Sequence, residues 1–177
     1  MTSRLTLEPL SFAHSHGMFQ LWSDADVCKY VGPVKDYAGA PIHMPVTTSA
    51  NSDRIIDFWI KAAKDGWGFR WAVLTCEPDC AFTGIVGFNT LKPCAEIAYH
   101  QLPALSGKGF MTEACHAAIG WVHEQGASEV DAFIEPDNAA SVALATRLGL
   151  SATDTYSDGA RRYRMSVYKV ARASLFH

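Results

Sequence analysis

Residues 106–114, Ser-Gly-Lys-Gly-Phe-Met-Thr-Glu-Ala, are the stretch on which the interpretation of the whole chain depends. They lie between the end of a predicted strand and the start of the strongest predicted helix, residues 109–124. Two glycines within three residues allow several backbone N–H groups to face one concavity, and the helix adds unpaired donors and the positive end of its dipole. This arrangement predicts a site for a pyrophosphate, with the charge of Lys108 nearby. A glycine-rich turn before an ordinary helix is the alternative at this point.

The stretch differs from two common phosphate-binding motifs. The P-loop pattern GxxxxGK[ST] is absent, and the dinucleotide fingerprint requires GxGxxG after the first strand of a βαβ unit. Here three consecutive predicted strands, residues 68–76, 81–91 and 94–101, form a meander before the glycines. A different phosphate-containing ligand is therefore expected.

The rest of the chain alternates strand and helix patterns. We predict strands at residues 4–8, 68–76, 81–91, 94–101, 129–134, 150–156 and 162–170, and helices at residues 11–22, 51–64, 109–124 and 138–148. Residues 32–52 carry three prolines and two glycines and are predicted to form a long loop, after which Asn51 or Ser52 caps the next helix. The predicted fold is one mixed α/β domain, residues 1–177, with a mostly antiparallel twisted sheet of about seven strands and helices on both faces.

Composition excludes several classes of protein. The formal net charge of −3 over 177 residues gives no reason to expect a nucleic-acid partner. The chain shows neither a signal-peptide pattern nor a run of membrane-spanning length, so we expect no membrane association and a cytoplasmic location. The five cysteines are odd in number and scattered, which predicts reduced thiols and no metal site. The oligomeric state is not indicated.

Four segments follow one another in an order and spacing typical of one family. Residues 106–114 are similar to WGKGYATEA, residues 135–141 and 147–150 to xPxNxxS…KLGF, residues 95–99 to AEIGY, and residues 4–10 and 21–24 to RLxLRPL…LWSD. The chain therefore resembles the GCN5-related N-acetyltransferases, and within them the branch of ribosomal-protein acetyltransferases. The resemblance spans nearly the whole chain and leaves out mainly residues 32–52.

The resemblance implies a GCN5-related fold and acetyl-coenzyme A as co-substrate, without a metal. The implied cofactor contacts are Tyr99, His100, Gln101 and Leu102 beside the pantetheine arm, Gly107, Lys108, Gly109, Phe110, Met111 and Thr112 at the pyrophosphate, and Asn138 and Ser141 on the next helix. Two positions depart from the family pattern. Ser106 replaces Arg, Gln or Trp, and Met111 replaces a small Gly or Ala. The larger methionine side chain is expected to crowd the phosphates.

Acetyl transfer to an amine requires a neutral amine, and therefore a general base near the acceptor. Glu96 is the candidate because it lies in the middle of an apolar strand, and it matches a glutamate that serves as base in some relatives. It shares one face of that strand with His100, a second candidate base, while Ile97 lies on the opposite face. A solvent-facing strand carboxylate is the alternative role of Glu96.

A proton donor for the departing thiolate is harder to assign. Many family members use a tyrosine at the position that Ala145 occupies here. The resemblance to some ribosomal-protein acetyltransferases implies Ser141 instead, although a serine there also suits a helix start. Tyr156 and Tyr163 on the late strands, or solvent, are the other possibilities.

The predicted activity is acetyl-coenzyme A-dependent N-acetylation by direct attack, with Glu96 as base. The acceptor is either a protein N-terminal α-amine or a small-molecule amine, because the segment expected to form its groove, residues 22–67, matches the family least. Aromatic residues of that segment, among them Trp22 and Trp59, suit a groove or a core equally well. The alternative function is a sensor module that binds coenzyme A with weak or no catalysis.

Overall fold

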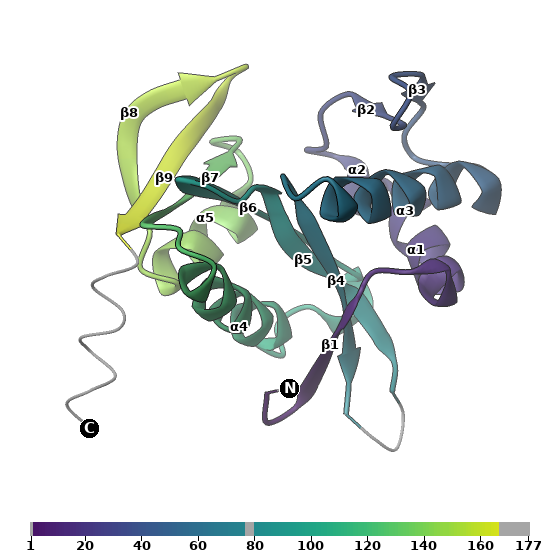
Figure 1. Ribbon diagram of the computed structural model, residues 1–177, viewed down its shortest axis with the longest axis horizontal. Helices are drawn as coiled ribbons and strands as arrows, with labels where there is room; N and C mark the ends of the chain where they lie inside the picture. The colour runs from purple at the N-terminus through teal and green to yellow at the C-terminus, as the bar shows by residue number, and fades with distance from the viewer. Residues whose placement is uncertain (1, 77–79, 167–177) are drawn as a thin grey trace.

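The computed structural model describes residues 2–76 and 80–166, whose main feature is a seven-stranded sheet (Figure 1). Its strands are β1 (Leu5–Pro9), β4 (Phe69–Thr75), β5 (Phe82–Thr90), β6 (Cys94–Gln101), β7 (Glu129–Ile134), β8 (Ser151–Ser157) and β9 (Ala160–Ser166). The strand order is β1-β4-β5-β6-β7-β9-β8, and every neighbouring pair is antiparallel except β6 and β7. The predicted mixed, mostly antiparallel sheet is confirmed.

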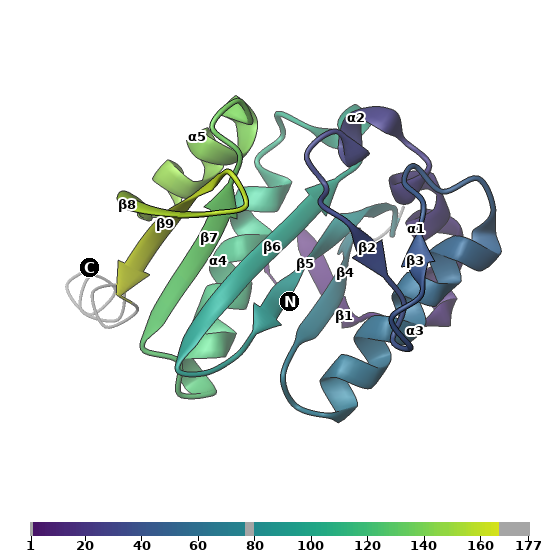
Figure 2. The ribbon, with the colours of Figure 1, turned by 90° about the horizontal axis from the view of Figure 1, so that it is seen from above.

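Helices cover both faces of this sheet, as predicted. They are α1 (Ser15–Trp22), α2 (Ala25–Cys28), α3 (Ser49–Lys64), α4 (Phe110–Glu124) and α5 (Ala139–Arg147). Apolar residues of α4 and α5 form one core cluster with β1, β4, β5, β6, β7 and β9, and residues of α1 and α3 form a second with β4 and β5. The two clusters lie on opposite faces of the sheet (Figures 1 and 2).

Alternation along β6 assigns its side chains to these two faces. Ala95 and Ile97 are 0% and 4% exposed and belong to the α4 cluster. Glu96, Ala98 and His100 alternate with them and point the other way, as His100 shows by packing its ring against Trp22 of α1. The predicted common face of Glu96 and His100 is thereby confirmed.

The segment before α3 differs from its prediction. The helix begins at Ser49, and its N-cap is Thr48, whose hydroxyl accepts a 3.4 Å hydrogen bond from the Asn51 N–H, so the predicted caps Asn51 and Ser52 were wrong. The first turn is polar, so the apolar period did not reveal it. The predicted loop also contains a small antiparallel pair, β2 (Val34–Lys35) and β3 (Pro41–Ile42).

Two other elements differ in detail. The short helix α2 was not predicted; Asp24 caps it by accepting hydrogen bonds from the N–H groups of Asp26 and Val27. The predicted turn at residues 77–79 and the predicted continuation of the last strand over residues 167–170 lie outside the described residues.

The helices on the α1 and α3 side reach only part of their face of the sheet. From the seven-stranded sheet, the buried residues in that core cluster are Ala72 of β4 and Ile85 of β5. Figure 2 looks onto this face and shows β6 and β7 uncovered between the β8–β9 hairpin and the α2, β2 and β3 segment.

Candidate functional site

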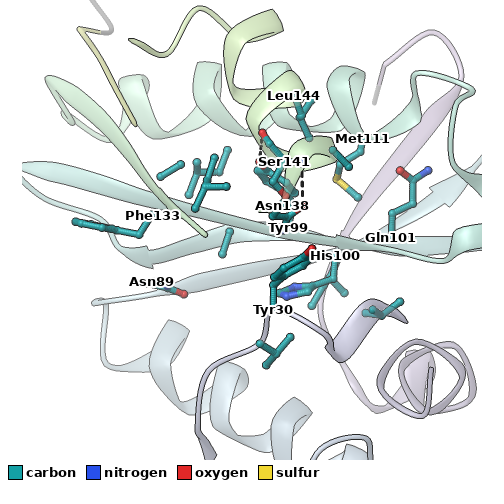
Figure 3. Close-up of a pocket in the computed structure, with 18 of the residues that line it drawn as sticks. Tyr30, Asn89, Tyr99, His100, Gln101, Met111, Phe133, Asn138, Ser141 and Leu144 are labelled. Atoms are coloured by element: carbon teal, nitrogen blue, oxygen red, sulfur yellow. Dashed lines mark hydrogen bonds between the residues drawn. The ribbon is translucent and has the colours of Figure 1, made fainter. Parts of the chain in front are cut away.

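The two parallel strands part in the middle of the sheet. β6 and β7 pair only from Cys94↔Glu129 to Glu96↔Asp131. Beyond that point β6 pairs only with β5, and β7 only with β9. The facing backbone edges of the two strands are therefore unpaired beyond Glu96, and a cavity of about 1950 Å³ opens there (Figure 3).

A glycine loop closes one end of this cavity. Gly107 and Gly109 have φ values of +78° and +76°, in the left-handed region that favours glycine. Gly109 is the N-cap of α4 and has no side chain to cap the helix, so the first-turn N–H groups of Phe110, Met111 and Thr112 receive no acceptor from it. A Cβ on Gly107 would meet no atom within 4 Å, so there is free space beside the loop. Open donors, a helix N-terminus and free space fit a diphosphate.

The N-terminal segment holds this loop in place, which sequence reasoning missed. Arg4 Nη1 donates to the Lys108 carbonyl at 2.9 Å, and the same guanidinium makes a 2.7 Å ion pair with Glu113 in the first turn of α4. Glu113 also accepts hydrogen bonds from Thr2, Ser3 and the Arg4 N–H. Burial raises the pKa of Glu113, but the hydrogen bonds from Thr2 and Arg4 outweigh it, so the pKa is lowered overall. Arg4 thus ties the glycine loop to the first turn of α4.

The implied cofactor residues fall into two groups. Those that line the cavity are Tyr99, His100, Gln101, Gly107, Gly109, Met111, Thr112, Asn138 and Ser141. Leu102, Lys108 and Phe110 lie outside its lining. The Leu102 N–H donates to Thr83 O on β5, away from the parted strands. Met111, at 5% exposure, packs into the α4 core cluster while lining the cavity.

Glu96 lies at the point where the strands part, and a polar network holds it. Its side chain is half-buried, and Asn89 Nδ2 donates to its Oε1 at 2.5 Å. The register of β5 and β6 shifts between Phe88 and Thr90, so Asn89 is the extra residue of a β-bulge. Asn89 Oδ1 in turn accepts a hydrogen bond from Arg70 of β4.

Arg70 is buried, at 5% exposure, and its guanidinium carbon lies 3.7 Å from the centre of the Trp59 ring. Burial lowers the pKa of Arg70 to about 9, although the Glu96 charge raises it in part. Arg70, Trp59, Asn89 and Glu96 all line the cavity. Sequence reasoning singled out Trp59 and Glu96 but missed Arg70 and Asn89. An arginine between two aromatic residues in a predicted strand was the available signal.

His100 differs from Glu96 in its electrostatics. Its ring centre lies 4.6 Å from that of Trp22. Burial, and secondarily the charge of Arg70, lower the pKa of His100 to about 3. A group with so low a pKa is a weak proton acceptor at neutral pH, which makes His100 a poor candidate for the base.

The start of α5 borders the other side of the cavity. Asn138 caps this helix, since its Oδ1 accepts from the Ser141 N–H at 3.2 Å. The Tyr99 hydroxyl donates to the Ser141 carbonyl at 3.3 Å, and burial is the main cause that raises the pKa of Tyr99 (Figure 3). Tyr156 and Tyr163, the other proposed acids, do not line the cavity.

The arginines of the β8–β9 hairpin lie apart from the cavity. The arginine run of the β8–β9 hairpin is engaged within the sheet: Arg164 binds Asp131 at 2.6 Å and Glu129 at 2.9 Å. Among residues 2–76 and 80–166, no cluster of three or more His, Cys, Asp or Glu side chains is arranged to hold a metal ion. Within the same ranges, no helix has the length and hydrophobicity needed to cross a membrane.

Comparison with known proteins identifies a family. Residues 4–151 match the family model described as acetyltransferase (GNAT) domain. A Bacillus licheniformis relative, the uncharacterized N-acetyltransferase p20, is 27% identical over 151 residues, which cover 83% of this chain and 79% of the relative.

Two solved structures share the fold at low sequence identity. The ribosomal L7/L12 α-N-protein acetyltransferase RimL in complex with coenzyme A has a TM-score of 0.74 at 19% identity, over 93% of this chain and 95% of its own. A mutant form of the spermidine N-acetyltransferase SpeG from Vibrio cholerae has a TM-score of 0.73 at 16% identity, over 97% and 99%. At these identities the two structures show the common fold alone.

Proposed function

Because the chain belongs to the acetyltransferase (GNAT) domain family, we propose that it transfers an acetyl group from acetyl-coenzyme A to an amine at the cavity between β6 and β7. The family makes the protein an N-acetyltransferase. Three features of this activity are proposals: acetyl-coenzyme A as the donor, the catalytic residues, and the amine acceptor. One observation supports all three: β6 and β7 separate immediately beyond Glu96, and the glycine loop with its open N–H groups lies at one end of the resulting cavity.

The cavity fits coenzyme A in its chemistry. The N–H groups of residues 107–112 would bind the diphosphate, and the unpaired edge of β6 at residues 99–101 would pair with the pantetheine arm. Asn138 and Ser141 border the same space from α5. Acetyl-coenzyme A supplies an activated acetyl thioester. A structural neighbour that holds coenzyme A supports this choice of donor.

Glu96 would accept the proton of the acceptor amine. A lysine amine has a pKa of about 10.4 and an α-amine about 7.7–8.0, so both are largely protonated at neutral pH. The Glu96 carboxylate lines the cavity on the face of the sheet that α1 and α3 cover only in part, and an acceptor can approach it there. Asn89 fixes one carboxylate oxygen, and the second stays available for the amine.

Ser141 would donate a proton to the departing thiolate. It lies in the first turn of α5 on the cavity wall, and Ala145, one turn later, has no proton to give. The need is modest, because a thiol pKa is about 8.5. Replacement of Ser141 by alanine is therefore expected to lower kcat less than replacement of Glu96.

The test compares the wild type with Glu96→Gln on a panel of peptides, amino acids and polyamines, with acetylation read by mass. We expect Glu96→Gln to lower kcat by about 10²–10⁴-fold, because a general base is lost, and to leave coenzyme A affinity within about twofold. Glu124→Gln, at an exposed carboxylate near the end of α4, is the matched control and retains activity. Equal turnover by Glu96→Gln and the wild type would refute the base. Coenzyme A binding without turnover by the wild type on any acceptor would indicate a sensor.

A further inference from the structure

Arg70 is a buried cation that has no direct counter-ion among the described residues. Four other arginines, Arg4, Arg54, Arg161 and Arg164, each have a carboxylate oxygen within 4 Å. Within residues 2–76 and 80–166, no carboxylate lies that close to Arg70, although it is only 5% exposed. Its hydrogen-bond acceptors are neutral: the Phe69 carbonyl at 3.0 Å and the side-chain carbonyl of Asn89. Buried charges are normally paired directly, so this guanidinium requires an explanation.

The partner that Arg70 lacks would have to come from the cavity. The guanidinium stacks on Trp59, which fixes its plane, and only two of its five N–H donors have acceptors among the described residues. Burial lowers the pKa of Arg70 to about 9 despite Glu96, so a further negative charge beside it would stabilise the charged form. The neighbouring His100 is neutral and supplies no charge.

The wall around Arg70 also has polar atoms without partners. Trp22 Nε1 and His100 Nδ1 are buried, and neither has a hydrogen-bond partner in the described structure. Their rings are in contact, and both residues line the cavity with Arg70. A small shift on binding would let such donors meet a polar ligand, and each new bond would recover the free energy of an unsatisfied group.

We propose that the acceptor is an amine that also carries a carboxylate, with the carboxylate bound by Arg70 and the amine directed to Glu96. This rests on the proposed function and names its substrate class. A planar guanidinium binds a carboxylate through two parallel hydrogen bonds. One asparagine side chain, Asn89, spans the distance from Arg70 to Glu96, so the two groups of the acceptor are close together. Either a free amino acid or an N-terminal residue with an acidic side chain meets this description.

The same geometry disfavours polyamines. A second ammonium group placed near Arg70 would be repelled, and the one carboxylate of the network, Glu96, is already held by Asn89. A second ammonium group therefore gains no ion pair from the network of Arg70, Asn89 and Glu96.

The first experiment uses the wild type and matched acceptors. Leucine is compared with isoamylamine, which lacks the carboxylate, and the peptide Asp-Ala-Ala with Asn-Ala-Ala. We expect kcat/KM to be at least tenfold higher for the carboxylate member of one pair. A difference between leucine and isoamylamine would indicate a free amino acid as acceptor, and a difference between the two peptides an acidic N-terminal residue. Ratios near one in both pairs would overturn the proposal, whatever the variants show.

The second experiment uses Arg70→Gln, with Lys64→Gln as a matched loss of one exposed positive charge. Arg70→Gln is expected to reduce the preference for the carboxylate member by about 10- to 150-fold, the range of a charge-assisted hydrogen bond, and Lys64→Gln to retain it. A uniform loss on both members would overturn the proposal and leave Arg70 as a positioning residue for Glu96. Failure of the proposed function is distinct: the wild type would then acetylate neither member of either pair and would show no thermal shift with coenzyme A.

Discussion

Replacing Gly107 by alanine separates the role of the glycine loop from ordinary backbone strain. Gly107 has φ +78°, and an added Cβ would meet nothing within 4 Å. Gly66, after α3, has φ +77° and equally open surroundings, but it does not line the cavity. Alanine in the left-handed region costs about 1–2 kcal/mol. Both variants should therefore lose about the same stability, with a fall in Tm of roughly 2–8 °C.

Only the Gly107 variant should lose affinity for coenzyme A. Alanine can relieve its strain by leaving the left-handed region, and this rotates a neighbouring peptide so that its N–H no longer faces the cavity. One charge-assisted hydrogen bond contributes about 1.5–3 kcal/mol, so the Kd should rise by about 10- to 150-fold. Calorimetry with coenzyme A measures this, while Gly66→Ala keeps the wild-type Kd. If the two variants bind coenzyme A equally well, the loop N–H groups do not hold the diphosphate.

Three further outcomes follow from the charges. Glu113→Gln should cost about 1 kcal/mol at pH 7. Because the folded-state pKa of Glu113 is lowered, this difference should vanish in urea unfolding as the pH falls below about 4. The pKa of His100 is about 3 in the folded state and about 6.5 in the unfolded chain, so only the unfolded chain takes up a proton between pH 7 and pH 5. This proton uptake should lower the free energy of unfolding by about 2 kcal/mol over that range. The His100→Phe variant should not show this loss. Arg164→Met leaves the buried Asp131 unpaired and should lower stability by about 2–4 kcal/mol in thermal melts, whereas Arg162→Met should cost under about 1 kcal/mol.

Local signals predicted most of the fold. The apolar stripe of α4 at Met111, Ala114, Ala118, Ile119 and Val122 is buried in the structure. Asn138 caps α5, and Gly149 follows its end in the left-handed region. These features depend on residues a few positions apart, so a single sequence contains the information. The first turn of α3 carries no apolar period and for that reason was placed too late.

The missed parts of the site depend on contacts between distant segments. Glu113 and Arg4 lie 109 residues apart, and nothing near either residue indicates the other. Arg70 and Asn89 are 19 residues apart on neighbouring strands, and they meet only in the observed register. A charged residue between Phe69 and Trp71 indicates an unusual position but not its partner.

The position of Glu96 also depends on register. It is the last β6 residue paired with β7, and its partner Asp131 lies on the same face of the sheet. A shift of one residue along β6 would place Ala95 or Ile97, whose side chains lie in the opposite core, at the point where the strands part. The bulge at Asn89 has the matching effect on β5, because the extra residue brings an amide between Arg70 and Glu96. The Glu96 carboxylate therefore lies where β6 and β7 separate because of the registers in which β5, β6 and β7 pair. A substitution that removed the bulge should impair the site while the core cluster built on α4 and α5, which lies on the other face of the sheet, stays intact.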